Sequence, residues 1–192
     1  MTTYQKPNRL MISLILVTLL FVSTILTLIF PRLGEILLLY PSNLYEPLNW
    51  YRLLTYPLFG GGLLSWFYNS MAIVLTGYII ENKIKRQKLI GLIILSSIIG
   101  GLVFVIINYG DTQNSPIASP TMISWGYWSA AIVIGLRNWR ILNLFEKIVM
   151  ILCFLSVLII WHDNLGFFIG QLSVILTIAL LTILKFGRRE VA

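Results

Sequence analysis

The chain has 192 residues, of which 58% are hydrophobic and only 11% are charged. Soluble domains carry roughly a quarter charged residues, so this composition excludes an ordinary soluble domain, a disordered chain and a coiled coil. A lone Cys153 also excludes a disulfide scaffold. Because the charges fall between long apolar runs, the sequence predicts an all-α membrane protein with a single polytopic domain over residues 1–192.

The apolar runs predict six membrane spans. A spanning helix needs about 20 apolar residues to cross a hydrocarbon layer of roughly 30 Å. Pro31 stops the first run, and the fourth is short and unusually polar, with two serines and two glycines. The predicted spans cover about 9–30, 63–80, 89–107, 122–136, 145–161 and 166–184.

The basic residues predict the orientation of these spans. In a membrane protein, Lys and Arg are retained on the cytoplasmic side, so the formal net charge of +7 indicates topology rather than a nucleic-acid partner. With six spans, 12 of the 14 basic residues fall on the side that holds both termini, which we therefore expect to be cytoplasmic. These are Lys6, Arg9, Lys83, Lys85, Arg86, Lys88, Arg137, Arg140, Lys147, Lys185, Arg188 and Arg189.

The connection between the first two spans, residues 31–62, is too apolar for a plain loop. Prolines at 41, 47 and 57 prevent one continuous helix, and the segment is rich in tyrosine and tryptophan, which favour the headgroup layer. We expect a structured element in the outer membrane interface. It either packs there as an amphipathic segment or forms a lateral lid over a cavity.

Several landmarks occur in a fixed order from Trp50 onward. Tyr51 to Thr55 reads Tyr-Arg-Leu-Leu-Thr, Asn69 lies in the second span, and Gly126 lies in the fourth. Asp163-Asn164 opens the last span, which carries Gly170. In this order and spacing, about three quarters of the chain resembles the rhomboid family of intramembrane serine proteases. The resemblance implies a six-helix rhomboid-like bundle with the interfacial loop between the first two spans.

The resemblance also implies where catalytic groups belong. Aligning Gly126 with the family's Gly-x-Ser-Gly motif places Trp125 at the nucleophile position. Aligning Asp163-Asn164 places Phe167 at the position of the catalytic His. Gly60 and Ser65 stand where the family has two further His, whereas Arg52, Asn69, Gly126 and Gly170 match its scaffold. The resemblance therefore predicts a member without the Ser–His dyad.

A displaced dyad is the first alternative. Ser129 lies one helical turn beyond Trp125, Ser124 directly precedes it, and His162 is the single histidine of the chain. His162 is expected at the membrane surface and Ser129 about 6 Å deeper than Trp125, which does not give the roughly 3 Å contact that a dyad needs. Close helix packing is the simpler role for both serines. Asn69 is expected either to bridge helices or to line a wet cavity.

The sequence thus predicts a catalytically inactive, rhomboid-like protein of the bacterial plasma membrane that binds transmembrane segments of client proteins. The alternatives are an active intramembrane protease with a displaced nucleophile, and a small permease. A permease would place charges at mid-membrane depth, whereas the charges here lie near span ends. We expect no cofactor, and no metal site, because one His and one Cys make none.

Overall fold

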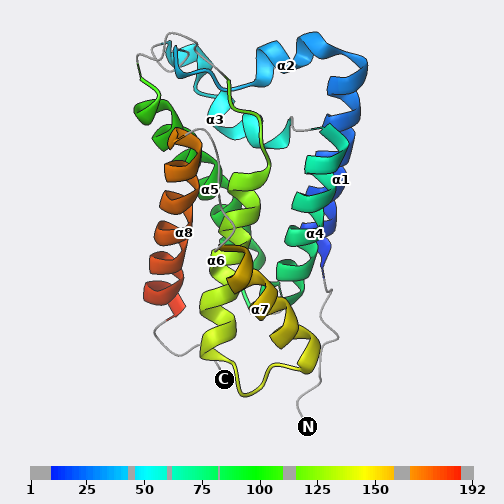
Figure 1. Ribbon diagram of the computed structural model, residues 1–192, viewed down its shortest axis with the longest axis vertical. Coiled ribbons are helices and arrows are strands. Elements are labelled where there is room, and N and C mark those ends of the chain that lie inside the picture. The colour runs from blue at the N-terminus through cyan, green and yellow to red at the C-terminus, as the bar shows by residue number, and fades with distance from the viewer. Residues whose placement is uncertain are drawn as a thin grey trace.

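The computed structural model describes residues 10–42, 46–59, 62–81, 83–109, 116–157 and 165–186. These segments form a helical bundle, as the sequence predicts (Figure 1). The main helices are α1 (Met11–Ile29), α4 (Gly62–Ile80), α5 (Arg86–Ile107), α6 (Thr121–Arg137), α7 (Leu144–Val157) and α8 (Leu165–Phe186).

Four of these helices, α1, α4, α5 and α8, are long and apolar enough to cross a membrane. Helix α6 has 17 residues and α7 has 14, which is fewer than the roughly 20 that a full span needs. Residues 158–161 of the predicted fifth span lie outside the described residues. The chain is therefore a multi-pass membrane protein, and the count of six spans stays a prediction.

Helix α6 occupies the middle of the bundle. It packs against α4, α5, α7 and α8, while α1 packs on the far side of α4. Figure 1 shows α1 and α4 along one side and α8 along the other. The turn between α4 and α5 and the C-terminal end of α8 lie at the same end of the bundle, which we call the basic end because residues 83–88 hold four of the basic side chains.

Several side-chain hydroxyls within the helices are satisfied by the helix itself. Thr18, Thr24 and Thr182 each donate a hydrogen bond to the carbonyl four residues earlier. A membrane offers no water to a buried hydroxyl, so this local bond removes the cost of placing Ser and Thr at depth. The apolar helices can therefore carry small polar residues at their contacts.

Residues 31–42 and 46–59 form a structured segment at the end opposite the basic end (Figure 1), which we call the interfacial segment. It contains α2 (Pro31–Leu37), α3 (Arg52–Thr55) and the short 3₁₀ helices η2 (Pro47–Asn49) and η3 (Tyr56–Leu58). Pro31 ends the first span as expected, but it also starts α2, because proline suits a first helical turn. A two-residue backbone bridge joins Leu39 to Ile117, just before α6, and thereby fixes the segment to the bundle.

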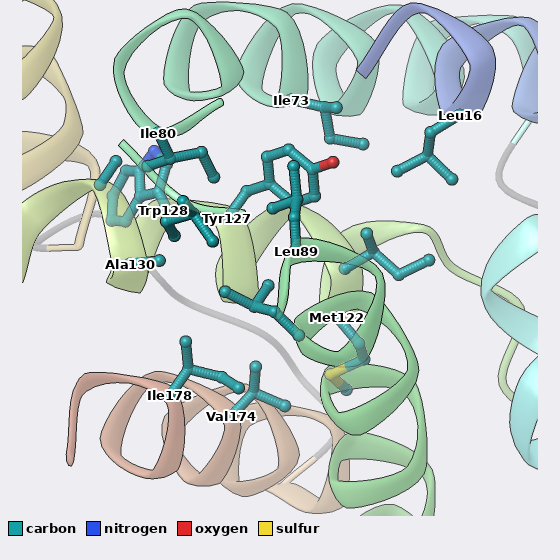
Figure 2. Packing of buried hydrophobic residues seen from close by; sticks show 14 of the residues in the cluster. Leu16, Ile73, Ile80, Leu89, Met122, Tyr127, Trp128, Ala130, Val174 and Ile178 are labelled. Carbon is teal, nitrogen blue, oxygen red and sulfur yellow. The ribbon is translucent and has the colours of Figure 1, made fainter. Parts of the chain in front are cut away.

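The core lies where α1, α4, α5, α6 and α8 meet. Figure 2 shows Val174 and Ile178 of α8 on one side and Ile73 and Ile80 of α4 on the other, with Tyr127 of α6 between the two groups. All five side chains are almost completely buried. This aliphatic packing holds α6 in place along its length, and the polar residues on the other faces of α6 define the candidate site.

Candidate functional site

The centre of the candidate site is a hydrogen bond between α4 and α6. The Ser124 hydroxyl donates to Asn69 Oδ1 at 2.7 Å and also to the carbonyl of Thr121 at 2.9 Å. The Asn69 amide in turn donates to the Ser65 carbonyl at 2.9 Å. Asn69 and Ser124 are both buried. Of the two roles that the sequence left open for Asn69, the structure supports the bridge between helices.

Ser129 makes the corresponding bridge on another face of α6. Its hydroxyl donates to the carbonyl of Ile175 in α8 at 2.6 Å, and its side chain is buried. A helix carbonyl is free to accept this second bond because it has two lone pairs. Both serines considered as displaced nucleophiles therefore connect helices through hydrogen bonds, which goes beyond the simple close packing expected for them.

Trp125 and Phe167 are both partly buried against the core cluster. The Trp125 ring meets Trp128 edge-on, with ring centroids 4.4 Å apart. The buried indole N–H of Trp125 has no hydrogen-bond acceptor among the described residues. The alignment that places Trp125 and Phe167 at the catalytic positions stays a prediction.

Gly126 and Gly170 allow close approaches of α5 to its neighbours. A Cβ added at Gly126 would overlap the Ser96 hydroxyl of α5. One added at Gly170 would lie 3.1 Å from the backbone oxygen of Gly100, also in α5. Both glycines are thus close-packing positions, as their place in a membrane helix suggests. They bring α6 and α8 against the same helix and so set the distance between the two expected catalytic positions.

Arg52 anchors the interfacial segment. Its Nη1 donates to the carbonyls of Glu35 at 3.0 Å and Leu38 at 2.7 Å, and its guanidinium lies 5.9 Å from the Tyr40 ring centre. From the sequence alone, backbone carbonyls and Glu46 are both candidate partners for this cation. Backbone carbonyls are the partners, and Glu46 accepts from the Asn49 side chain instead.

Glu81, at the basic end, has a role that the sequence did not reveal. Its carboxylate accepts hydrogen bonds from the backbone N–H groups of Ile12 at 3.1 Å and Ser13 at 2.6 Å. Helix α1 has no acidic residue in its own first turn. A carboxylate at a helix N-terminus satisfies free N–H groups and complements the helix dipole. The only sequence signal is an acidic residue directly after an apolar run.

Gln171 is a second residue that the sequence analysis missed. Its side chain is 0% exposed, and neither amide atom has a hydrogen-bond partner among the described residues. It lies on α8 one turn beyond Phe167, so both side chains share a helix face. A buried amide without a partner is costly, which makes Gln171 a candidate to contact water or a bound group.

The remaining predicted positions, Gly60 and residues 161–164 with His162, lie outside the described residues. No group of three His, Cys, Asp or Glu side chains arranged to hold a metal occurs in the part of the chain that the structure describes. The described part of the site is therefore a set of serines, amides and aromatic rings.

Comparison with known proteins agrees with this architecture. Residues 47–184 match the Rhomboid domain. No curated protein matches the chain. The match begins in the interfacial segment and covers α4 to α8 almost completely, including Arg52, Asn69, Ser124 and Gly170. The chain belongs to the rhomboid family.

Proposed function

We propose that this rhomboid-family membrane protein is catalytically inactive and binds transmembrane segments of other proteins. The observation that carries the proposal is the direction of the Ser124 hydrogen bonds. A nucleophilic serine needs a base to take its proton. The Ser124 hydroxyl instead donates to an amide oxygen of Asn69 and to a backbone carbonyl, neither of which is a base at neutral pH.

The surroundings of the second serine support the same conclusion. Ser129 donates to a backbone carbonyl, and the described residues contain no imidazole. Phe167, at the position that the resemblance assigns to the base, carries only a hydrocarbon ring. Lysine, the other common base, is found among the described residues in 83–88, at Lys147 near the start of α7 and at Lys185 near the end of α8. Neither the displaced dyad nor the permease has comparable support among the described residues.

A serine-reactive fluorophosphonate probe tests the inactivity. The purified protein, Ser124→Ala and Ser129→Ala are compared in the same micelles, with an active rhomboid protease as positive control. We expect labelling of all three at background level and no cleavage of a reporter transmembrane substrate. Labelling of the unmodified chain that disappears in either serine variant would contradict the proposal.

The client surface in this proposal is the outer face of α4 beside α7. Leu64, Phe67, Tyr68 and Met71 on α4 are all more than half exposed. Helix α7 meets α4 through Tyr78 and Phe145, whose ring centroids are 5.8 Å apart, near the basic end. The half of α4 away from the basic end is thus open to a client helix.

Site-specific photo-crosslinking tests this surface. A photoreactive phenylalanine analogue is placed at Phe67, and at Leu176 on the outward face of α8 as a matched control, because Leu176 is 69% exposed. We expect a reporter transmembrane helix in the same bilayer to crosslink at position 67 at least several times more than at position 176. Equal crosslinking at both positions would exclude a dedicated client surface on α4.

We further propose a bacterial plasma-membrane location with both termini in the cytoplasm. The support is the gathering of basic residues at one end of the bundle. In a Cys153→Ser background, a cysteine at Ser119 is expected to react with an impermeant reagent in intact cells, and one at Lys85 only after lysis. The opposite pattern would reverse the orientation.

A further inference from the structure

A groove between α5 and α8 opens toward the membrane near the basic end. Its volume is about 430 Å³, within the range of sites for small ligands. Most of its lining is aliphatic, including Ile94, Leu95, Ile98 and Leu181. It lies well away from Asn69 and Ser124, which face each other between α4 and α6. The groove is therefore separate from the candidate site.

Gly91 gives the groove its depth. A Cβ added at Gly91 would meet no atom within 4 Å. Gly62, the first residue of α4, is open as well, whereas the glycines further inside α4, α5, α6 and α8 (Gly77, Gly100, Gly101, Gly126, Gly135, Gly166 and Gly170) each have a neighbour that such a Cβ would touch. A mid-helix glycine destabilises a helix relative to alanine. No contact among the described residues explains the presence of a glycine at position 91. The missing side chain leaves room there for a group from outside the chain.

The mouth of the groove is basic. Gln87 and Lys88 line it, no acidic side chain among the described residues does, and Lys85 and Arg86 precede them at the start of α5. All four are exposed. The groove thus combines an apolar slot at membrane depth with positive charge at the level of the headgroups.

We propose that this groove binds one anionic phospholipid, with an acyl chain lying over Gly91 and the headgroup phosphate at Lys88. The aliphatic lining fits a hydrocarbon chain, and clusters of basic residues next to a membrane helix attract anionic headgroups. Free phosphate would leave the apolar slot empty. A client helix is about 10–12 Å across, whereas this slot lies between two helices that pack directly against each other.

Native mass spectrometry of the full chain in detergent tests the proposal. Phosphatidylglycerol and phosphatidylcholine with the same acyl chains are titrated in parallel. We expect one tightly retained phosphatidylglycerol. Lys88→Ala should lower its affinity about fivefold, the equivalent of ~1 kcal/mol for one charge at the membrane surface, and leave phosphatidylcholine unchanged. Lys147→Ala, which removes the same charge from α7, is the matched control and should have no effect.

A second variant tests the slot itself. Gly91→Phe places a ring in the groove from a position where the Cβ itself meets no neighbour, and Gly91→Leu is a smaller replacement if the first fails to fold. Either should lower phosphatidylglycerol retention at least tenfold with unchanged circular dichroism. Equal retention of both lipids, insensitivity to Gly91 replacement, or displacement of the lipid by inorganic phosphate would each overturn the proposal. Crosslinking of a reporter helix at Gly91 in place of lipid would overturn it as well.

Discussion

The two halves of α5 make opposite use of glycine. In the half near the interfacial segment, a Cβ at Gly101 would lie within 3.0 Å of Leu53, Tyr56 and Leu39. At the same level, Gly100 lies against Met122 of α6 and Gly170 of α8. In the half near the basic end, Gly91 faces open space. One helix is thus tightly enclosed at one end and borders an open groove beside α8 at the other.

This difference shows that a small residue in a membrane helix does not always mark a close contact between helices. Glycine lowers the distance between helices only where a neighbour takes up the freed space. Where none does, it leaves a recess whose occupant must come from the membrane or a partner. The contrast between Gly101 and Gly91 can be tested by making the same kind of replacement at both.

The largest effect is expected for Gly101→Leu. The new side chain would collide with three side chains of the interfacial segment, so that segment would have to move away from α5. Overpacking of this kind costs about 1–3 kcal/mol or more. The free energy of unfolding in mixed detergent–SDS micelles should fall by at least roughly 2 kcal/mol. A neutral result would mean that the interfacial segment is not packed on Gly101.

Gly170→Val should come second. The added Cβ would press on the backbone oxygen of Gly100, which cannot rotate away as a side chain can. We expect a loss of about 1–2 kcal/mol, somewhat offset by the better helix propensity of valine over glycine. The free energy of unfolding in the same mixed micelles measures this loss. A gain in stability would contradict the close contact between α5 and α8.

Tyr56→Phe should have a smaller effect with its own pH signature. The Tyr56 hydroxyl donates to the Ser97 carbonyl of α5 at 2.9 Å, and its loss should cost about 1 kcal/mol. Burial also raises the pKa of Tyr56 above the ordinary 10. Because the folded state favours the protonated form, this contribution is complete below pH 10 and is lost at higher pH. The variant should therefore lose less stability than the native chain between pH 10 and pH 11.

Gly91→Ala should have the smallest effect and the opposite sign. Its Cβ meets nothing, so the better helix propensity of alanine is expected to raise stability by up to ~1 kcal/mol in lipid-free micelles. Thermal unfolding followed by circular dichroism measures it. A destabilisation similar to that of Gly101→Leu would remove the contrast between the two halves of α5.

Sequence patterns were sufficient for the features that depend on the membrane as a solvent. Long apolar runs must form helices there because each backbone polar group needs an internal partner, so α1, α4, α5 and α8 begin and end within a few residues of the predicted spans. The place of Arg52 in the interfacial segment and its need for a hydrogen-bond acceptor also follow from an isolated cation among apolar residues. These are local properties that do not depend on which helices become neighbours.

Only the tertiary structure decided the roles of residues that depend on a neighbour. Ser124 and Ser129 look alike in sequence, yet one binds the side chain of Asn69 and the other the backbone of α8. Gly91 and Gly101 also look alike, yet one is open and the other enclosed. Gln171 shows no sign in the sequence that its amide has no partner among the described residues. The role of a hydroxyl, a glycine or an amide depends on the atoms that face it. In a helix bundle those atoms come from segments that are distant in the chain.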